Sequence, residues 1–256
     1  MNTFDLFQLR GQVALVTGGG RGLGFQISEA LSDAGCAIAL CSRKLETCED
    51  AAQVLKSKGV DTKAYQCDLG NEEDINRVVN DVIEDFGKID ILVNNSGTTW
   101  GANVESMPLE AWEKVMRVNV TGTFLMSQAV GRLMIELASG KIINIASAAG
   151  LKAEPPEVLN AIGYSTSKAA VAHFTRDLAR KWAHHGVYVN AIAPGIFPTK
   201  MTKAVLDRTG DAIVEKNPLN RIGDEDAIKG TALLLATEAS DFMTGQVLSV
   251  DGGSTL

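Results

Sequence analysis

Three side chains in the middle of the chain have the types and the spacing of a proton-transfer site. Tyr164 and Lys168 lie four residues apart, which places them on one face of a helix, one turn from each other. Ser147 precedes them, at the end of the apolar run 142–146. A phenol has an ordinary pKa near ~10, and a nearby ammonium lowers that pKa because it favours the phenolate. We therefore predict that Tyr164 is a general acid and base and that the Ser147 hydroxyl holds a carbonyl oxygen.

A structural role is the alternative for each of these residues. Tyr164 also fits a core aromatic, Ser147 a turn residue and Lys168 a solvated cation. The pattern Tyr-x-x-x-Lys is common by chance, so its weight depends on the sequence upstream.

A glycine-rich segment near the N-terminus gives the second chemical signal. The apolar run 13–17 leads into Gly18-Gly19-Gly20-Arg21-Gly22-Leu23-Gly24, and a helix is predicted over 25–34. In this context glycines let the backbone approach a pyrophosphate, and the helix N-terminus supplies N–H groups and partial positive charge. The spacing Gly18-x-x-x-Gly22-x-Gly24 differs from the G-x-G-x-x-G fingerprint, so a tight turn without a ligand is the alternative.

The end of the next predicted strand, 37–41, indicates which dinucleotide is bound. Ser42-Arg43-Lys44 follows it, and the first carboxylate is Glu46. An acid here suits the ribose of NAD, whereas a base suits the 2′-phosphate of NADP. Arg43 and Arg21 predict NADP(H) rather than NAD(H). The alternative is that Arg43 and Lys44 are the solvated start of the next helix.

Alternating strands and helices would position these residues. Apolar runs predict strands over 13–17, 37–41, 62–67, 89–93, 142–146, 187–193 and 246–250. The remaining pattern predicts helices over 25–34, 45–58, 72–86, 108–137, from 162 onward, and 225–236. Such alternation predicts an α/β fold, a single Rossmann-like domain over 1–256 whose doubly wound sheet has about seven parallel strands and helices on both faces.

Two segments stand out from this alternation. Residues 196–221 read as irregular and follow the carboxyl end of a strand, which predicts a substrate lid. The cations of this lid are Lys200, Lys203, Arg208, Lys216 and Arg221. Asn119 falls inside the predicted helix 108–137, where a polar Asn is mildly unfavourable unless it has a function, and Gly122 is expected to mark a bend.

Composition excludes several classes of protein. The chain has 256 residues, a net charge of −7 and 45% hydrophobic residues, so it lacks a basic footprint for nucleic acid. We expect no membrane span and no signal peptide, and hence a cytoplasmic location. Three histidines and four cysteines without a C-x-x-C pair predict no metal site. The cysteines, expected to be reduced and mostly buried, are Cys36, Cys41, Cys48 and Cys67.

Together these features resemble the short-chain dehydrogenase/reductase family over essentially the whole chain. The matching motifs are Thr17-Gly18-x-x-x-Gly22-x-Gly24, Asp68, Asn94-Asn95-Ser96-Gly97, Asn119, Ser147, Tyr164-x-x-x-Lys168, Pro194-Gly195 and Asp251-Gly252-Gly253. Each motif alone is modest, but their joint order is highly specific.

The resemblance implies a role for each residue. Tyr164 gives its proton to the substrate oxygen as hydride arrives from the nicotinamide, and Ser147 holds that oxygen. Lys168 binds the nicotinamide ribose and lowers the pKa of Tyr164, while Asn119 holds a water that links Lys168 to solvent. With the glycine turn and the cations, the predicted cofactor-binding residues are Gly18, Gly20, Arg21, Gly22, Leu23, Gly24, Ser42, Arg43, Asp68, Leu69, Asn95, Ser96, Gly97, Tyr164, Lys168, Pro194, Gly195, Phe197 and Thr199.

Two departures from the family pattern concern the site. Ser96 stands where the family most often has Ala. The distance from Ser147 to Tyr164 is 164 − 147 = 17 positions, longer than the family's usual spacing. The extra residues fall around Glu154-Pro155-Pro156-Glu157, and we expect them to reshape the substrate mouth.

Two branches of the family are nearly equally similar. Phe4-Asp5-Leu6 and the cationic lid favour the gluconate 5-dehydrogenase branch and a keto sugar acid as substrate. The 3-oxoacyl-carrier-protein reductase branch implies an acidic carrier that docks near Arg132, with His185 replacing another arginine, but a net charge of −7 makes that partner less favoured. An NADPH-binding sensor without turnover is the alternative of another class. The resemblance also implies a homotetramer.

Overall fold

The computed structural model describes residues 2–256, without the side chains of residues 204 and 209. Its seven strands form one parallel sheet in the order β3-β2-β1-β4-β5-β6-β7, which confirms the predicted doubly wound fold. The strands are β1 Val13–Thr17, β2 Ala37–Ser42, β3 Thr62–Gln66, β4 Ile91–Asn94, β5 Gly140–Ile145, β6 Val187–Pro194 and β7 Val247–Val250.

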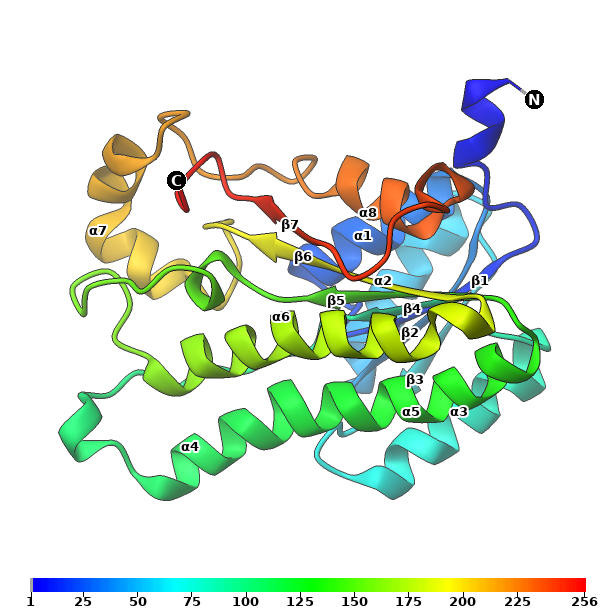
Figure 1. The fold of residues 1–256 in the computed structure, drawn as a ribbon, viewed down its shortest axis with the longest axis horizontal. Helices are drawn as coiled ribbons and strands as arrows, with labels where there is room; N and C mark the ends of the chain where they lie inside the picture. The colour runs from blue at the N-terminus through cyan, green and yellow to red at the C-terminus, as the bar shows by residue number, and fades with distance from the viewer. Residues whose placement is uncertain (1) are drawn as a thin grey trace.

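Helices cover both faces of the sheet (Figure 1). One face carries α1 Gly22–Asp33, α2 Leu45–Ser57 and α8 Lys229–Ala236. The other carries α3 Glu72–Phe86, α5 Gly122–Glu136 and α6 Ile162–Trp182, with α4 Leu109–Met116 leading towards α5. Short 3₁₀ helices span Thr3–Phe7, Val104–Ser106, Ala148–Gly150, Ala183–His185 and Glu238–Ser240.

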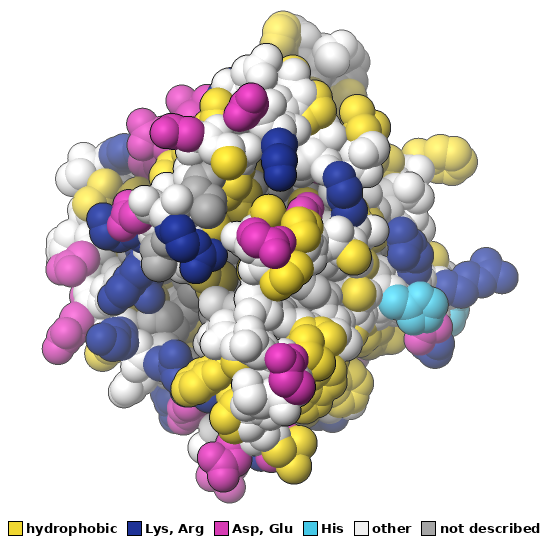
Figure 2. All heavy atoms as spheres, turned by 90° about the vertical axis from the view of Figure 1, so that its left-hand side faces the viewer, with side chains coloured by type: hydrophobic (Ala, Val, Ile, Leu, Met, Phe, Trp, Pro, Cys, Tyr) yellow, Lys and Arg dark blue, Asp and Glu magenta, His cyan; other side chains and the backbone are white. Residues whose placement is uncertain are grey.

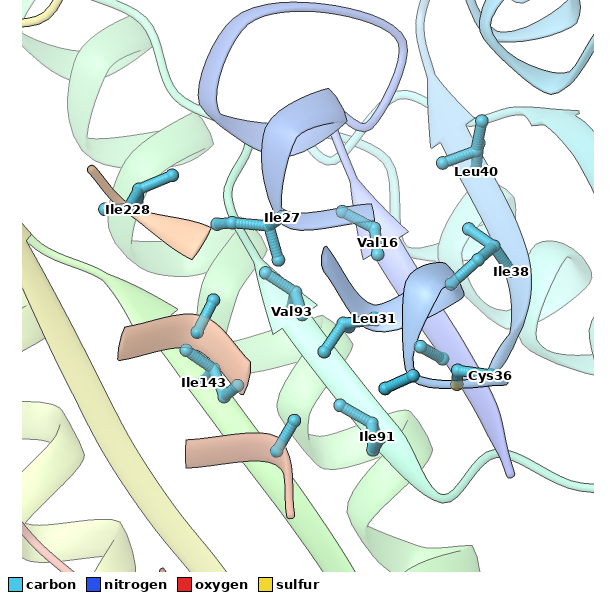
Figure 3. Close-up of a cluster of buried hydrophobic side chains, with 14 of the residues drawn as sticks. Val16, Ile27, Leu31, Cys36, Ile38, Leu40, Ile91, Val93, Ile143 and Ile228 are labelled. Atoms are coloured by element: carbon cyan, nitrogen blue, oxygen red, sulfur yellow. The ribbon is translucent and has the colours of Figure 1, made fainter. Parts of the chain in front are cut away.

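Alternate residues of the inner strand β1 contribute to the two cores. Val16 packs against α1 on one face, whereas Leu15 faces the helices of the other. Figure 3 shows the first core, where Ile27 and Leu31, one turn apart on α1, lie over Val16 and Val93. Because strands covered on both faces are buried throughout, they read as continuous apolar runs rather than alternating ones.

The long helical region predicted over 108–137 contains an irregular turn. A π-helical segment, Arg117–Thr121, connects α4 to α5 and contains Asn119. Gly122 itself has ordinary helical angles, so the expected bend at this glycine is replaced by the π turn before it. Gly122 permits a close approach instead, since a Cβ there would lie 2.8 Å from the carbonyl oxygen of Leu69.

The C-terminal part differs from the sequence prediction in two places. The segment 196–221 is not irregular throughout, because it contains α7, Lys203–Lys216. The last helix, α8, begins at Lys229 rather than at residue 225. All four cysteines are free and buried. Within residues 2–256, none of the helices combines the length and the apolar character needed to span a bilayer, and no group of three or more potential metal ligands occurs.

Candidate active site

A cleft of about 990 Å³ lies at the carboxyl edge of the sheet. Each of the first six strands contributes the residues at or just after its carboxyl end, from Gly18 after β1 to Gly195 after β6. In doubly wound sheets ligands bind at this edge. Strands β5, β6 and β7 point towards it in Figure 1, and Figure 2 looks onto it, with lysine and arginine side chains gathered on its left.

The cleft brings together almost every predicted site residue. The two exceptions are Gly24 and Asn119. Gly24 packs behind the glycine turn, where a Cβ would lie 2.4 Å from the carbonyl oxygen of Gly18. Asn119 is only 1% exposed. The cleft is also lined by residues that the sequence analysis predicted neither as catalytic nor as cofactor-binding: Lys44, Thr47, Cys67, Thr98, Thr99, Val118, Ile145, Ala146, Pro198, Lys200, Met201, Thr202, Lys203, Leu206 and Asp207. Those from Pro198 to Asp207 belong to the predicted lid.

The glycine turn presents bare backbone to the cleft. Gly18 and Gly22 have φ angles of +64° and +55°, which favour glycine. A Cβ at Gly20 would lie 2.6 Å from the carbonyl oxygen of Thr47. Helix α1 begins at Gly22, and the side chain of its N-cap residue, Arg21, makes no capping hydrogen bond. Helix N–H groups that no side chain caps fit a phosphate group.

Asn95 and Thr17 hold this turn in place. The Nδ2 of Asn95 donates to the carbonyl oxygens of Thr17 at 2.9 Å and Gly18 at 3.1 Å. The Oγ1 of Thr17 accepts from the backbone N–H groups of Asn95 and Ser96, each at 3.0 Å. The Nδ2 of Asn95 is therefore already bonded to the protein, and the predicted contact of Asn95 with the cofactor stays a prediction.

Cations dominate the end of the cleft beside β2. Arg21, Arg43 and Lys44 line it, and among the described residues none of them forms an ion pair. The hydroxyl proton of Ser42 is already used within the protein, since it is donated to the carbonyl of Lys44 at 2.9 Å. Asp68 also lines the cleft, and its Oδ1 accepts from the N–H of Gly70 at 2.9 Å. This arrangement fits an extra phosphate better than a bare ribose.

Ser147, Tyr164 and Lys168 converge in the cleft as the sequence predicts. Ser147 caps the 3₁₀ helix after β5, and its Oγ accepts from the N–H of Ala149 at 3.2 Å. Tyr164 and Lys168 lie in the first two turns of α6, with Nζ 5.8 Å from the centre of the phenol ring. The longer segment between Ser147 and Tyr164 is mostly exposed over residues 151–157, and the two side chains still line one cleft.

The predicted lowering of the Tyr164 pKa by Lys168 is wrong for the protein alone. Burial raises the pKa of Tyr164, although the adjacent Ser147 hydroxyl partly opposes this shift. Burial also lowers the pKa of Lys168 to about 8. The ammonium donates instead to the carbonyl oxygen of Ile145 at 2.6 Å, on the strand rather than on the phenol. Desolvation therefore dominates both groups and keeps Tyr164 in its proton-donating form.

Asn119 joins the β4 loop to the helix of the Tyr-Lys pair. Its Oδ1 accepts from the N–H of Thr98 at 2.8 Å, and its Nδ2 donates to the Thr98 carbonyl at 2.9 Å and to the Ser167 hydroxyl at 2.8 Å. A Cβ at Gly97 would lie 3.5 Å from both Asn119 Oδ1 and Lys168 Nζ. The missing side chain of Gly97 thus leaves space between these two polar atoms. The predicted water relay stays a prediction.

A buried polar chain that the sequence analysis missed fixes the strands beneath the site. Asn94 Nδ2 donates to Asn144 Oδ1 and to Ser127 Oγ of α5, and Asn144 Nδ2 donates to Thr175 Oγ1 of α6, all at 2.9 Å. Asn94 and Asn144 are register partners on β4 and β5. The sequence indicates this pair only by an Asn near the carboxyl end of each of two apolar strands.

The two loops at the substrate side are tied together. Asn160 Nδ2 donates to Asn103 Oδ1 at 2.8 Å, and its carbonyl accepts from the N–H of Ala102 at 3.0 Å. The lid approaches the same loop through Arg208, whose Nη2 lies 3.5 Å from the carbonyl of Glu157. The extra residues around Glu154 therefore belong to a loop that contacts both the β4 loop and the lid.

Comparisons with known proteins agree with this geometry. A 3-oxoacyl-acyl-carrier-protein reductase of rhamnolipid biosynthesis from Pseudomonas aeruginosa is 39% identical, over 96% of this chain and 97% of its own. A gluconate 5-dehydrogenase from Gluconobacter oxydans is 35% identical, over 98% of each chain. The crystal structure of a gluconate 5-dehydrogenase from Burkholderia cenocepacia, in complex with NADP and tartrate, is 36% identical and has a TM-score of 0.94 over 99% of each chain.

The family match supports the same conclusion. The sequence pattern described as short chain dehydrogenase matches residues 12–210, which include the glycine turn, Ser147, Tyr164 and Lys168. The protein therefore belongs to the short-chain dehydrogenase family.

Proposed function

We propose that the protein is an NADP(H)-dependent oxidoreductase that interconverts a ketone and a secondary alcohol. The observation that carries this proposal is the meeting of Ser147, Tyr164 and Lys168 in one cleft with the glycine turn. One end of that cleft has the donors of a proton-transfer site, and the other has backbone and cations suited to phosphate.

The residues present fit an NADP(H) molecule. The glycine turn would hold the diphosphate, and Arg43 with Arg21 would hold the 2′-phosphate. NADP in the related Burkholderia cenocepacia structure supports this choice. When bound, the cofactor accepts or supplies the hydride. Lys168 would orient it through the nicotinamide ribose, and the space beside Gly97 keeps the approach open.

The residues of this chain then perform the proton transfer. The Ser147 hydroxyl donates to the substrate carbonyl oxygen and holds it beside Tyr164. As the carbonyl carbon receives hydride, the Tyr164 O–H breaks and its proton moves to the oxygen, which leaves a phenolate and an alcohol. In the oxidation direction the phenolate takes that proton back. The raised pKa of Tyr164 favours the protonated form that reduction needs.

A keto sugar acid is our proposed substrate. The relatives named gluconate 5-dehydrogenase support it. The second candidate is a 3-oxoacyl-acyl-carrier-protein substrate, which the Pseudomonas aeruginosa relative supports. Arg132 is exposed on α5 for such a carrier. Turnover of 5-ketogluconate against a 3-oxoacyl thioester, with and without its carrier, separates the two.

Replacement of Tyr164 by Phe tests the reaction class. We expect reduction of any accepted ketone to fall by about 10²-fold or more, with binding of NADPH retained. Tyr188→Phe is the matched control, since Tyr188 lies outside the cleft. Full activity in Tyr164→Phe would contradict the proposed role. A wild type that binds NADPH but reduces nothing in a broad carbonyl panel would favour the sensor alternative.

We further propose a cytoplasmic homotetramer. Phe124 of α5 is 45% exposed and packs edge-on against Phe174 of α6, with ring centres 6.4 Å apart. Phe242, before β7, is fully exposed. Exposed aromatic side chains on these elements support burial against other subunits. Light scattering that gives a monomer mass would contradict the tetramer.

A further inference from the structure

We propose that Lys200 and Lys203, at the start of α7, bind the cofactor diphosphate from the side opposite the glycine turn, so that the lid closes on the cofactor. This inference rests on the proposed function and deepens it. It assigns cofactor recognition to the segment 196–221, which the sequence predicts to be a substrate lid.

Both lysines are placed for this contact. They line the same cleft as Gly20, Gly22 and Leu23. Thr199, which precedes them, lies directly over the turn, because its Cγ2 is 3.5 Å from the position of a Cβ on Gly22. An anion seated on the turn is therefore within reach of the flexible four-carbon stem of a neighbouring lysine.

Neither lysine is neutralised strongly by the protein. In the described part of the chain Lys200 forms no ion pair, and the partner of Lys203 is Asp207, one turn further along α7, at 3.8 Å. The side chains of Lys203 and Asp207 are 76% and 64% exposed, so this pair is weak. Two positive charges are thus available at the cleft margin.

The start of α7 also carries a cation that is only weakly paired. At the start of α3, Asn71 accepts from the N–H groups of Glu73 and Asp74, and acids fill the first turn. At the start of α7 the Thr202 side chain makes no capping bond, and Lys203 occupies the first turn. Cations are unfavourable at the positive end of a helix. A bound diphosphate removes this repulsion.

A substrate carboxylate offers similar chemistry to the same lysines. The placement of Thr199 over Gly22, a residue of the glycine turn, favours the diphosphate. The two sources differ in what the lysines affect. If the lysines bind the diphosphate, their loss weakens the binding of every dinucleotide, whatever the substrate. If they bind a substrate carboxylate, their loss raises the KM of acidic substrates alone.

The test measures cofactor affinity by isothermal titration of Lys200→Gln, Lys203→Gln and the double variant. We expect the double variant to bind NADPH and NADH each about tenfold more weakly than the wild type does, with a shallower salt dependence. Adenosine 2′-monophosphate, which lacks the diphosphate, should bind as it does to the wild type. Lys216→Gln is the matched control, because it lies on α7 but outside the cleft lining.

A gain-of-affinity variant makes the test independent of damage to the lid. Asp207→Asn removes a negative charge from the cleft and releases Lys203, so NADPH and NADH should both bind about two- to threefold more tightly. Unchanged cofactor affinity in the double variant overturns the inference, and a raised KM for acidic substrates alone would assign the lysines to substrate. A wild type that does not bind NADPH would instead overturn the proposed function.

Discussion

The Nζ atom of Lys168 lies 2.6 Å from the carbonyl oxygen of Ile145, the last residue of β5. The ammonium is therefore anchored to the sheet and not to the phenol of Tyr164, although both side chains share one face of α6. Anchoring at the strand end fixes the position of the Lys168 ammonium, which we propose binds the cofactor ribose. It also buries a charge, which has a measurable consequence for stability.

Lys168→Met should remove a pH dependence of folding. The pKa of Lys168 is about 8 in the folded protein, below the ordinary value of ~10.4 in the unfolded chain. Between these values the unfolded chain binds the proton and the folded chain does not, so the wild type gains stability as the pH rises, by at most ~1.4 kcal/mol per pH unit. Urea unfolding from pH 7 to 10 should show that the free energy of unfolding of the wild type rises with pH relative to that of the variant. The same pH dependence of the free energy of unfolding in wild type and variant would contradict a lowered pKa of Lys168.

Arg43→Ala should change which cofactor is bound. If Arg43 grips the 2′-phosphate, NADPH affinity falls about tenfold or more while NADH affinity stays the same. Titration of both cofactors measures this, and Lys56→Ala, at the other end of α2, is the control. A wild type that prefers NADH, or an equal loss for both cofactors, would mean that Arg43 is only a solvated residue before α2.

Gly97→Ala should reduce turnover without unfolding the protein. The added methyl lies 3.5 Å from Asn119 Oδ1 and Lys168 Nζ, which is ordinary contact, so stability should change by less than about 1 kcal/mol. It fills the space between the two polar atoms, and we expect kcat to fall by about tenfold or more. Gly101→Ala, in the same loop and also 3.5 Å from its nearest neighbour, is the control. Unchanged kcat would show that this space is not used.

Asn144→Ala should destabilise the protein from beneath the site. The variant leaves the Nδ2 of Asn94 with Ser127 as its remaining partner and removes the bond to Thr175. Lost bonds between fully buried polar groups cost about 2–4 kcal/mol here. Urea unfolding measures the loss, and Asn76→Ala, on the exposed side of α3, should change stability by less than about 0.5 kcal/mol. Equal effects of the two variants would argue against the buried chain.

Local patterns were sufficient to predict most of the site, because its parts are short. The glycine turn, Arg43 and the Tyr164–Lys168 spacing each depend on a few neighbouring residues. Arg43, Tyr164, Lys168 and most of the glycine turn line the cleft. The direction of the Tyr164 pKa was not predictable in this way. It depends on burial and on the bond from Lys168 to Ile145, which only the folded chain defines.

Helix α7 is a second feature that the sequence did not predict. Its sequence contains a Thr-Gly pair and several charges, so its apolar period is weak and it reads as irregular. The structure forms the helix because Thr199 and Thr202 organise its start, with Lys203 N–H donating to the Thr199 carbonyl at 3.0 Å. Similarly, the π turn at Asn119 follows from tertiary bonds to Thr98 and Ser167.

The strand order has a consequence for how the protein is made. The glycine turn, Arg43 and Asp68 follow β1, β2 and β3, which form one half of the sheet. A nascent chain that has emerged as far as Gly97 already contains every strand needed to pair β1 on both sides. Ser147, Tyr164 and Lys168 arrive only later, with β5 and α6. The half that grips a nucleotide is thus synthesised as a unit before the half that performs chemistry exists, and cofactor present at that stage would meet a growing chain that cannot yet turn it over.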